Sequence, residues 1–300
     1  MKPPVFDYVA PRSVRETVDA LGDPGRTAAV IAGGQSLLLE MHLWRRRPDL
    51  VVDVNRVAGL DGLGVDGGSL RVGALVRHAA FEAPQAVPGP LGTLFQQAVT
   101  NIAHPPIRAR GTLVGSLAWA HPASEWCAVA LALDADLTLR DSDGARQVPA
   151  RDYFQGPHRT ARRPRELITS VRFPLLSDDT GVAFIEHRRT HFCFATVAVS
   201  ATLTVRDGVI TGSRIGLVNA SDRPVRALAA EQSLLGAEIA DDLYHRAGRA
   251  AAEQDAAPVA EPFADPGYKR QAVAVLVGRA LRRAAADQRS RAAGRTEGLR

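Results

Sequence analysis

Apolar and polar positions follow two different periods along the chain, and both occur in its first 57 residues. Ser13 is followed three residues later by Glu16, apolar residues then recur at helical spacing up to Leu21, and a glycine comes next. This combination of start, period and stop signals predicts a helix. The apolar runs TAAVI and LVVDV are typical of buried strands, and SLLLEMHLW between them predicts a second helix that ends before Pro48.

The middle of the chain predicts hairpins and helices in turn. LDGLGVDGGSLRVGAL holds two short segments around an Asp-Gly-Gly turn, which indicates a β-hairpin. Gly62, Gly64 and Gly67 match a dinucleotide-binding fingerprint, but that fingerprint must open a helix, and the residues after it alternate as in a strand. A helix is predicted from about Pro90 to Ile102, and DSDGAR predicts a further hairpin turn.

Proline and aspartate cluster in residues 171–184, where we place a domain boundary. Beyond it, FATVAVSATLTV and DGVITGSRIGLVN predict strands, whereas AEQSLLG to AGRAAAEQ and GYKRQAVAVLVGRALRRAA predict helices. Strands followed by helices indicate an antiparallel sheet with helices packed on one face. Helices and strands mix throughout the chain, so we predict the α+β class. Residues 286–300 are basic, and we expect a frayed, solvated tail there.

Composition limits the classes of function. The 300 residues are 46% hydrophobic and 23% charged, as in an ordinary globular protein. Cys127 and Cys193 are too few for a disulfide framework or for a four-cysteine iron–sulfur cluster on this chain. No signal peptide or membrane span is apparent, so we predict a soluble, cytoplasmic protein. Aromatic residues make up only 5%, which argues against nucleic acid as a partner despite the net charge of +5.

A search for nucleophile and metal motifs finds none. G-x-S-x-G, the G-x-x-x-x-G-K-[ST] phosphate loop and H-E-x-x-H are all absent. His187 and His191 stand at a spacing of four, but in a segment expected to be a loop, and Cys127 lies among apolar residues as a buried cysteine would. We therefore predict no catalytic residue and no metal ligand on this chain.

Two glycine-bearing turns without basic residues remain, AGGQSLL at 32–38 and GTLVGS at 111–116. Glycines let backbone N–H groups approach a phosphate, and a helix that opens just afterwards presents its positive end to the anion. The hydroxyls of Ser36 and Thr112 are further donors. Each turn also fits an ordinary connection from strand to helix, so both interpretations stay open at this point.

The residues around these turns resemble a known family. AGGQSLL, RGTLVGSLAWAHPASEW, RDYFQG and ELITSVRFP together resemble the FAD-binding subunit of molybdenum hydroxylases. That family includes the medium subunits of aerobic carbon monoxide dehydrogenases and the flavin domain of xanthine dehydrogenase. The resemblance extends over nearly the entire chain, from FDYVAPRS to GYKRQAVAVLVGRAL.

The resemblance implies a set of cofactor-binding residues. In the family, the two loops wrap the FAD pyrophosphate, and an acidic residue after the second loop bonds the ribityl or ribose hydroxyls. The set carried over by position is Ala32, Gly33, Gly34, Gln35, Ser36, Leu37, Thr112, Gly115, Ser116 and Glu125. Taken without the resemblance, Glu125 fits a solvated acid at a helix start equally well.

Three residues depart from the family pattern. Val114 stands where the family has the first glycine of a pair, His121 stands where it usually has aspartate, and Cys193 replaces the aspartate of a turn near the flavin ring. We expect FAD to be retained, because binding through backbone groups tolerates changes of side chain. The alternative is a subunit that has lost FAD.

The resemblance also implies fold and function. It implies an FAD-binding domain over 1–176 of the vanillyl-alcohol oxidase and para-cresol methylhydroxylase type, in two sub-domains at about 1–57 and 58–176. A C-terminal α+β domain would follow over 177–285, with FAD in the cleft between them.

The implied function is electron transfer within a heterotrimer or its dimer. A large subunit would carry the molybdenum cofactor, a small subunit the iron–sulfur clusters, and FAD on this chain would pass the electrons to an external acceptor. The alternatives are a stand-alone FAD-dependent oxidase or dehydrogenase, and a scaffold subunit without FAD.

Overall fold

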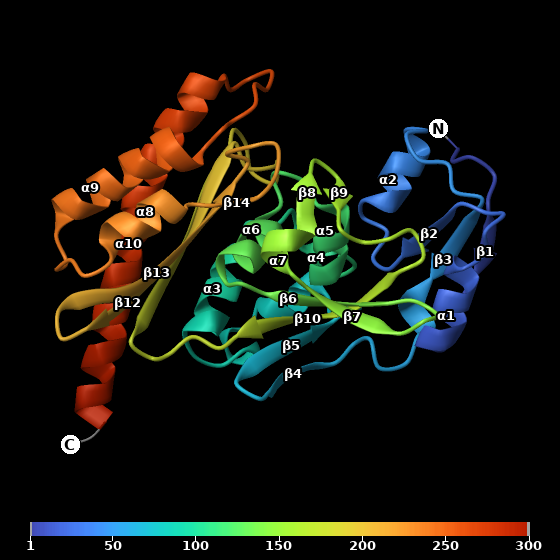
Figure 1. The fold of residues 1–300 in the computed structure, drawn as a ribbon, viewed down its shortest axis with the longest axis horizontal. Helices are drawn as coiled ribbons and strands as arrows, with labels where there is room; N and C mark the ends of the chain where they lie inside the picture. The colour runs from blue at the N-terminus through green and yellow to red at the C-terminus, as the bar shows by residue number, and fades with distance from the viewer. Residues whose placement is uncertain (1, 299–300) are drawn as a thin grey trace.

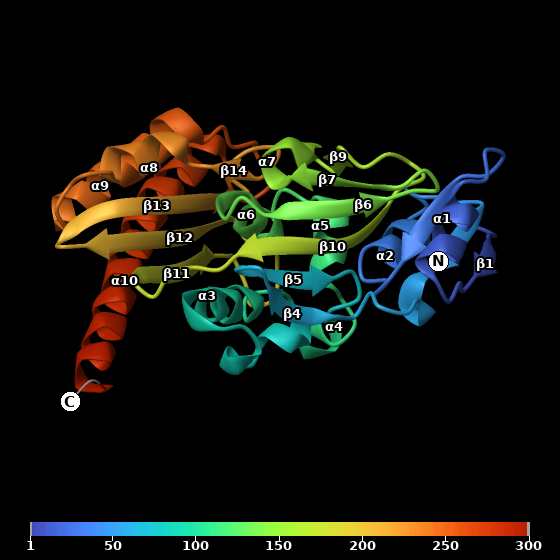
Figure 2. The ribbon, with the colours of Figure 1, turned by 60° about the horizontal axis from the view of Figure 1, so that its bottom comes forward.

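The computed structural model describes residues 2–298 and shows three main sheets in a row along the long axis of the molecule (Figure 1). The N-terminal sheet is parallel, whereas the central and the C-terminal sheets are antiparallel and lie end to end (Figure 2). Helices accompany every sheet, so the prediction of a mixed α+β chain is confirmed.

The N-terminal region contains the predicted strands and helices. Its elements are β1 (Asp7–Val9), α1 (Val14–Leu21), β2 (Ala28–Ile31), α2 (Leu37–His42) and β3 (Leu50–Asp53), with the strands in the order β1-β3-β2. The start of α1 follows the sequence signal, because the Ser13 side chain accepts a hydrogen bond from the Glu16 N–H at 3.1 Å. Because β2 and β3 are parallel, their carboxyl ends meet at one edge of the sheet.

The central sheet has the order β4-β5-β10-β6-β7. Its strands are β4 (Leu63–Asp66), β5 (Ser69–Gly73), β6 (Asp136–Arg140), β7 (Ala145–Pro149) and β10 (Leu167–Pro174). The predicted Asp-Gly-Gly hairpin joins β4 to β5, and both Gly67 and Gly68 have positive φ. The hairpin β8 (Phe154–Gly156) and β9 (Arg159–Thr160) forms a separate ribbon.

In the described chain, five further helices belong to the central region. They are α3 (Gly89–Val99), α4 (Pro105–Arg108), α5 (Leu113–Trp119), α6 (Glu125–Ala132) and α7 (Ala150–Tyr153). Helix α5 packs on β5 and β10, whereas α3 and α6 also contact the C-terminal sheet. Val182 and Phe184 of that sheet consequently belong to the same apolar core as the central region.

The C-terminal sheet is covered by helices on both faces. Its elements are β11 (Thr180–His187), β12 (Val197–Arg206), β13 (Val209–Val218), β14 (Val225–Arg226), α8 (Leu228–Leu234), α9 (Asp241–Ala250) and α10 (Pro266–Gly298). The long helix α10 packs across β11 and β12 beside α9 (Figure 1). The sequence predicts helices on one face of this sheet only. In the structure, α3 and α6 of the central region cover its other face.

The segment predicted as a domain boundary, 171–184, holds the end of β10, a short connection and the start of β11. Residues 286–298 of the basic tail continue α10, and the last two residues of that tail lie outside the described residues. Arg291 in this part binds Asp287 at 2.8 Å and Thr93 of α3 at 2.6 Å, so this turn of the helix is fixed to the central region.

Candidate cofactor site

The first glycine loop connects β2 to α2. Gly34 has a φ of +75°, a conformation that residues with a Cβ rarely adopt. The backbone N–H groups of Gly33, Gly34, Gln35 and Ser36 donate no hydrogen bond to any residue in the described part of the chain. These four neighbouring N–H groups are free to donate hydrogen bonds to a ligand. An anion-binding site requires such a group of donors.

The two glycine loops are in direct contact. A Cβ added at Gly33 would overlap the carbonyl oxygen of Arg110 and lie 2.7 Å from the Cα of Gly111. No larger residue fits there without moving one backbone away from the other. Gly33 is therefore required by the approach of the second loop, in addition to any approach of a ligand.

Two polar side chains stabilise this contact. Sequence reasoning did not identify either of them. The Asn55 amide donates to the Ala32 carbonyl at 2.8 Å, and Arg77 donates to the Asn55 side-chain oxygen at 2.6 Å and to the Arg110 carbonyl at 2.5 Å. Asn55 follows β3 just as Ala32 follows β2, so adjacent parallel strands bring the two together. The place of Asn55 after β3 could have been inferred only by assuming that β2 and β3 pair as parallel neighbours.

The second loop leads into α5. Thr112 is the N-cap, and its hydroxyl oxygen accepts from the Gly115 N–H at 2.9 Å. A Cβ at Gly115 would lie 2.7 Å from that oxygen, which explains the glycine. Val114 is only 4% exposed and packs into the main core, although it also lines the cleft between the loops. Its side chain is therefore shared between the core and the wall of the cleft.

One cleft collects nearly all the predicted cofactor-binding residues. Ala32, Gly33, Gly34, Gln35, Ser36, Leu37, Thr112, Gly115 and Ser116 all line it. Glu125, the tenth predicted residue, is not part of its lining. Arg46 and Arg162 line the cleft as well, so the site is not free of positive charge as the two turns alone suggest. Burial lowers the pKa of Arg162, and the nearby charge of Arg46 adds to this effect.

A neutral histidine closes the inner side of the cleft. His78 is buried, and its Nδ1 accepts from the Trp126 indole N–H at 3.0 Å. Burial, followed by the charges of Arg108 and Arg77, lowers the His78 pKa to about 3. It is therefore uncharged at neutral pH, which leaves the arginines as the positive groups of the cleft.

Glu125 lies instead at the seam between the central and C-terminal regions. It is buried at the start of α6, and burial raises its pKa to about 7. Glu186 at the end of β11 is a second acid there, with a side chain that is 0% exposed and carboxylate oxygens that accept no hydrogen bond from the described residues. Arg188 approaches it at 3.5 Å. Burial first, and the charge of Glu125 second, raise the Glu186 pKa to about 8.

Aromatic rings stack beside the cleft. Trp119, which lines the cleft, stacks on His121, and His121 stacks on Phe194 with ring centroids 4.5 Å apart. Burial lowers the His121 pKa to about 4, so this histidine is neutral at neutral pH. Cys193 lies next to Phe194, and its bonds to the Thr190 backbone lower the thiol pKa. One of the three departures from the family pattern, His121, thus belongs to this stack, and another, Cys193, precedes its Phe194 in the sequence.

No group of three or more histidine, cysteine, aspartate or glutamate side chains within residues 2–298 is arranged to hold a metal ion. None of the helices over the same residues has the length and apolarity needed to cross a bilayer.

Comparison with known families accounts for most of the chain. Residues 4–176 match the family described as the FAD binding domain in molybdopterin dehydrogenase. Residues 182–284 match the CO dehydrogenase flavoprotein C-terminal domain. The predictions of FAD as the cofactor and of a family of oxidoreductase subunits are thereby confirmed.

Individual relatives agree. The chain is 35% identical over 285 residues to the 6-hydroxypseudooxynicotine dehydrogenase complex subunit alpha of Paenarthrobacter nicotinovorans, covering 95% of this chain and 96% of the relative. It is 31% identical to the carbon monoxide dehydrogenase medium chain of Hydrogenophaga pseudoflava, covering 94% and 97%. A solved structure of carbon monoxide dehydrogenase from that organism superposes with a TM-score of 0.91 at 33% identity, covering 96% and 99%. The chain therefore belongs to the family of FAD-binding medium subunits of molybdenum hydroxylases.

Proposed function

We propose that this chain transfers electrons through FAD inside a molybdenum hydroxylase complex. The observation that carries the proposal is the cleft between the glycine loops, where four adjacent backbone N–H groups have no partner in the described chain. A pyrophosphate supplies the acceptor oxygens that such a loop lacks. Arg46 and Arg162 are positive groups on the same cleft, which Glu40 and Glu166 also line.

The arrangement of these residues supports FAD as the ligand of the cleft. Gly33, Gly34, Gln35 and Ser36 would present N–H groups to the pyrophosphate, and the Ser36 hydroxyl makes no helix-capping bond and is available as a further donor. Trp119 and His121 offer flat, neutral ring faces next to the cleft, which suits the conjugated part of a dinucleotide. Glu125 would accept hydroxyl donors where the cofactor reaches the seam. This last role is a prediction from the family resemblance.

Bound FAD would supply a group that exchanges one or two electrons, while the protein supplies position and electrostatics. This chain has two cysteines, too few for a four-cysteine iron–sulfur cluster, so we place the clusters on a small partner subunit and the molybdenum cofactor on a large one. The names of relatives as complex subunits and medium chains support this arrangement. We also propose the division at residues 176 and 177, and a fold of the vanillyl-alcohol oxidase type for the first domain.

The first test is the visible absorption spectrum of the purified chain. We expect flavin absorption, and we expect denaturation followed by chromatography to release FAD. A colourless chain that ignores added FAD would contradict the proposal and favour the scaffold alternative. The cleft between the loops argues against that alternative, because it is present although Val114 is one of its lining residues.

A second test addresses electron transfer itself. The reduced iron–sulfur subunit is mixed with the FAD-loaded chain under anaerobic conditions, and flavin absorption is followed over time. Bleaching of the flavin band is the expected result. Oxidation of a small alcohol by the isolated chain, with no response to the iron–sulfur subunit, would instead support a stand-alone oxidase.

A further inference from the structure

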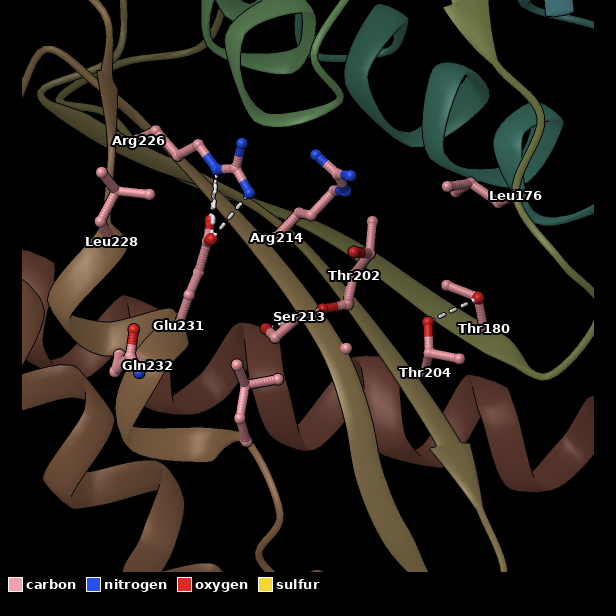
Figure 3. Close-up of a pocket in the computed structure, with 12 residues that line it drawn as sticks. Leu176, Thr180, Thr202, Thr204, Ser213, Arg214, Arg226, Leu228, Glu231 and Gln232 are labelled. Carbon is pink, nitrogen blue, oxygen red and sulfur yellow. Dashed lines mark hydrogen bonds and ion pairs between the residues drawn. The ribbon is translucent and has the colours of Figure 1, made fainter.

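Two hollows on the C-terminal domain differ in whether their arginines are already paired. The first, lined by threonines of the sheet and by α8, contains Arg214 and Arg226 (Figure 3). Arg226 binds Glu231 at 2.9 Å and Asp134 at 2.7 Å, and Arg214 also pairs with Asp134. These ion pairs satisfy both arginines, so this hollow has little charge to offer a partner.

The second hollow, which we call the α10 groove, has unpaired arginines. It lies between the end of β11 and the first half of α10 and encloses about 630 Å³. Its lining residues are Asn101, Phe184, Ile185, Glu186, His187, Tyr268, Gln271, Ala272, Val275, Leu276, Arg279 and Arg283. Both Arg279 and Arg283 are exposed, and neither makes an ion pair or hydrogen bond with the described residues.

Two other arginines of the same helix are paired. Arg282 binds Asp241 at 3.0 Å, and Arg291 binds Asp287 at 2.8 Å. Glu186 is the one acid among the residues that line the groove, but its side chain is fully buried at the seam and faces Arg188. The groove therefore presents uncompensated positive charge.

The groove also has a defined shape. Val275, Arg279 and Arg283 follow one another at four-residue intervals, so their side chains form one row along α10, with Cβ atoms of successive members about 5 to 6 Å apart. Val275 and Tyr268 are each 44% exposed, and the Tyr268 hydroxyl meets His187 at 2.6 Å. An apolar position followed by two guanidinium groups suits a peptide segment better than a single small anion.

The opposite wall is an edge strand. β11 is the outermost strand of its sheet, and side chains occupy part of its free edge: Asp287 accepts from the Val182 N–H at 3.0 Å and Gln97 from the Phe184 N–H at 2.8 Å. The groove begins at the end of this protected stretch, beside residues 184–187. Extended residues two apart on one face are separated by about 6.6 Å, close to the spacing of the two arginines.

We propose that an acidic, extended segment of a partner subunit lies in the α10 groove, with alternate carboxylates on Arg279 and Arg283. This inference rests on the proposed function, which makes the chain one subunit of a complex. A second copy of this chain fits poorly, because the chain has a net charge of +5 and the groove is itself positive.

The test uses the chain co-expressed with the iron–sulfur and molybdenum subunits of its complex. R279E/R283E is compared with R140E/R165E, which makes the same change of charge at exposed arginines without ion pairs elsewhere. We expect the groove variant to bind the partner subunits at least about tenfold more weakly, as like charges placed across an interface repel. FAD content and melting temperature should stay at the wild-type level, which excludes misfolding as the cause.

Cross-linking then identifies the occupant. A photo-cross-linking amino acid in place of Val275 should attach to an acidic segment of a partner subunit, and mass spectrometry locates the site. Attachment to a second copy of this chain, wild-type assembly of R279E/R283E, or equal loss in the R140E/R165E control would each overturn the proposal. A wild-type chain that forms no complex at all would count against the proposed function as well. A complex that still forms with R279E/R283E would count only against the proposed binding of a partner segment in the α10 groove.

Discussion

The cleft between the glycine loops and the seam around Glu125 are built in opposite ways. The cleft is made by backbone: Gly33 allows two loops to touch, and Asn55 and Arg77 hold their carbonyl groups in place. The seam is made by side chains, with two buried acids beside one arginine. Backbone contacts tolerate change at neighbouring side chains, whereas a buried cluster of charge depends on each member. The two regions should therefore respond differently to mutation and to pH.

Gly33→Val should disrupt the contact between the two glycine loops and abolish FAD binding. The added side chain overlaps the Arg110 carbonyl, so the second loop must move away. We expect complete loss of FAD from the purified chain, together with a decrease of about 1 to 3 kcal/mol in the free energy of unfolding, the scale of overpacking. Gly64→Val is the matched control, because a Cβ at Gly64 meets nothing within 4 Å. Flavin absorbance at the wild-type level in Gly33→Val would refute the loop contact.

Arg77→Met should loosen the cleft without blocking it. The change removes two hydrogen bonds from a charged donor and leaves the Arg110 carbonyl and the Asn55 side chain without it. Hydrogen bonds to charged groups contribute about 1.5 to 3 kcal/mol, so the FAD dissociation constant should rise by about ten- to a hundredfold. Fluorescence titration of the apo chain measures this constant. Arg71→Met on β5 serves as the control. An equal loss of FAD affinity in this control would show that the hydrogen bonds of Arg77 do not stabilise the cleft.

Glu125→Ala tests whether the cofactor reaches the seam. If its carboxylate accepts FAD hydroxyls, binding should weaken by about 1 to 3 kcal/mol, the usual effect of losing a charged hydrogen-bond partner. This is the result we expect. The same titration measures it, with Glu253→Ala on the surface of the C-terminal domain as the control. Unchanged affinity would remove Glu125 from the binding site and leave the seam with a purely structural role.

Glu186→Gln should have the smallest effect on FAD binding, because it acts on stability, and its effect on stability should grow as the pH rises above 4.5. Burial raises the Glu186 pKa from 4.5 to about 8, so between these values the folded chain holds a proton that the unfolded chain releases. Wild-type stability attributable to this group therefore falls as the pH rises from 4.5 to 8. We expect the apo variant to melt on the order of 10 °C above the wild type at pH 8.5 and to match it near pH 4.5, because each pKa unit corresponds to about 1.4 kcal/mol.

Melting curves at several pH values measure this difference, with Glu253→Gln on the surface as the control. A constant offset between variant and wild type at all pH values would show that packing, and not proton binding, separates them.

The sequence by itself determined the local elements and the identity of the loops. The cap of α1, the glycine hairpin of β4 and β5, and the two glycine turns all follow from interactions between residues close in the chain, and these residues carry their signals locally. The family resemblance also depended on such short motifs, which is why it named nine of the residues that line the cleft.

Only the tertiary structure decided what those loops touch and where the charges meet. Arg77 and Asn55 become a brace because parallel strands end side by side, and Glu186 meets Glu125 because α6 packs against the C-terminal sheet. Glu125 is predicted to bind FAD hydroxyls, and the tertiary structure puts it at the seam and not in the lining of the cleft. Burial and pairing of charge are properties of packing between distant segments, and no local pattern encodes them.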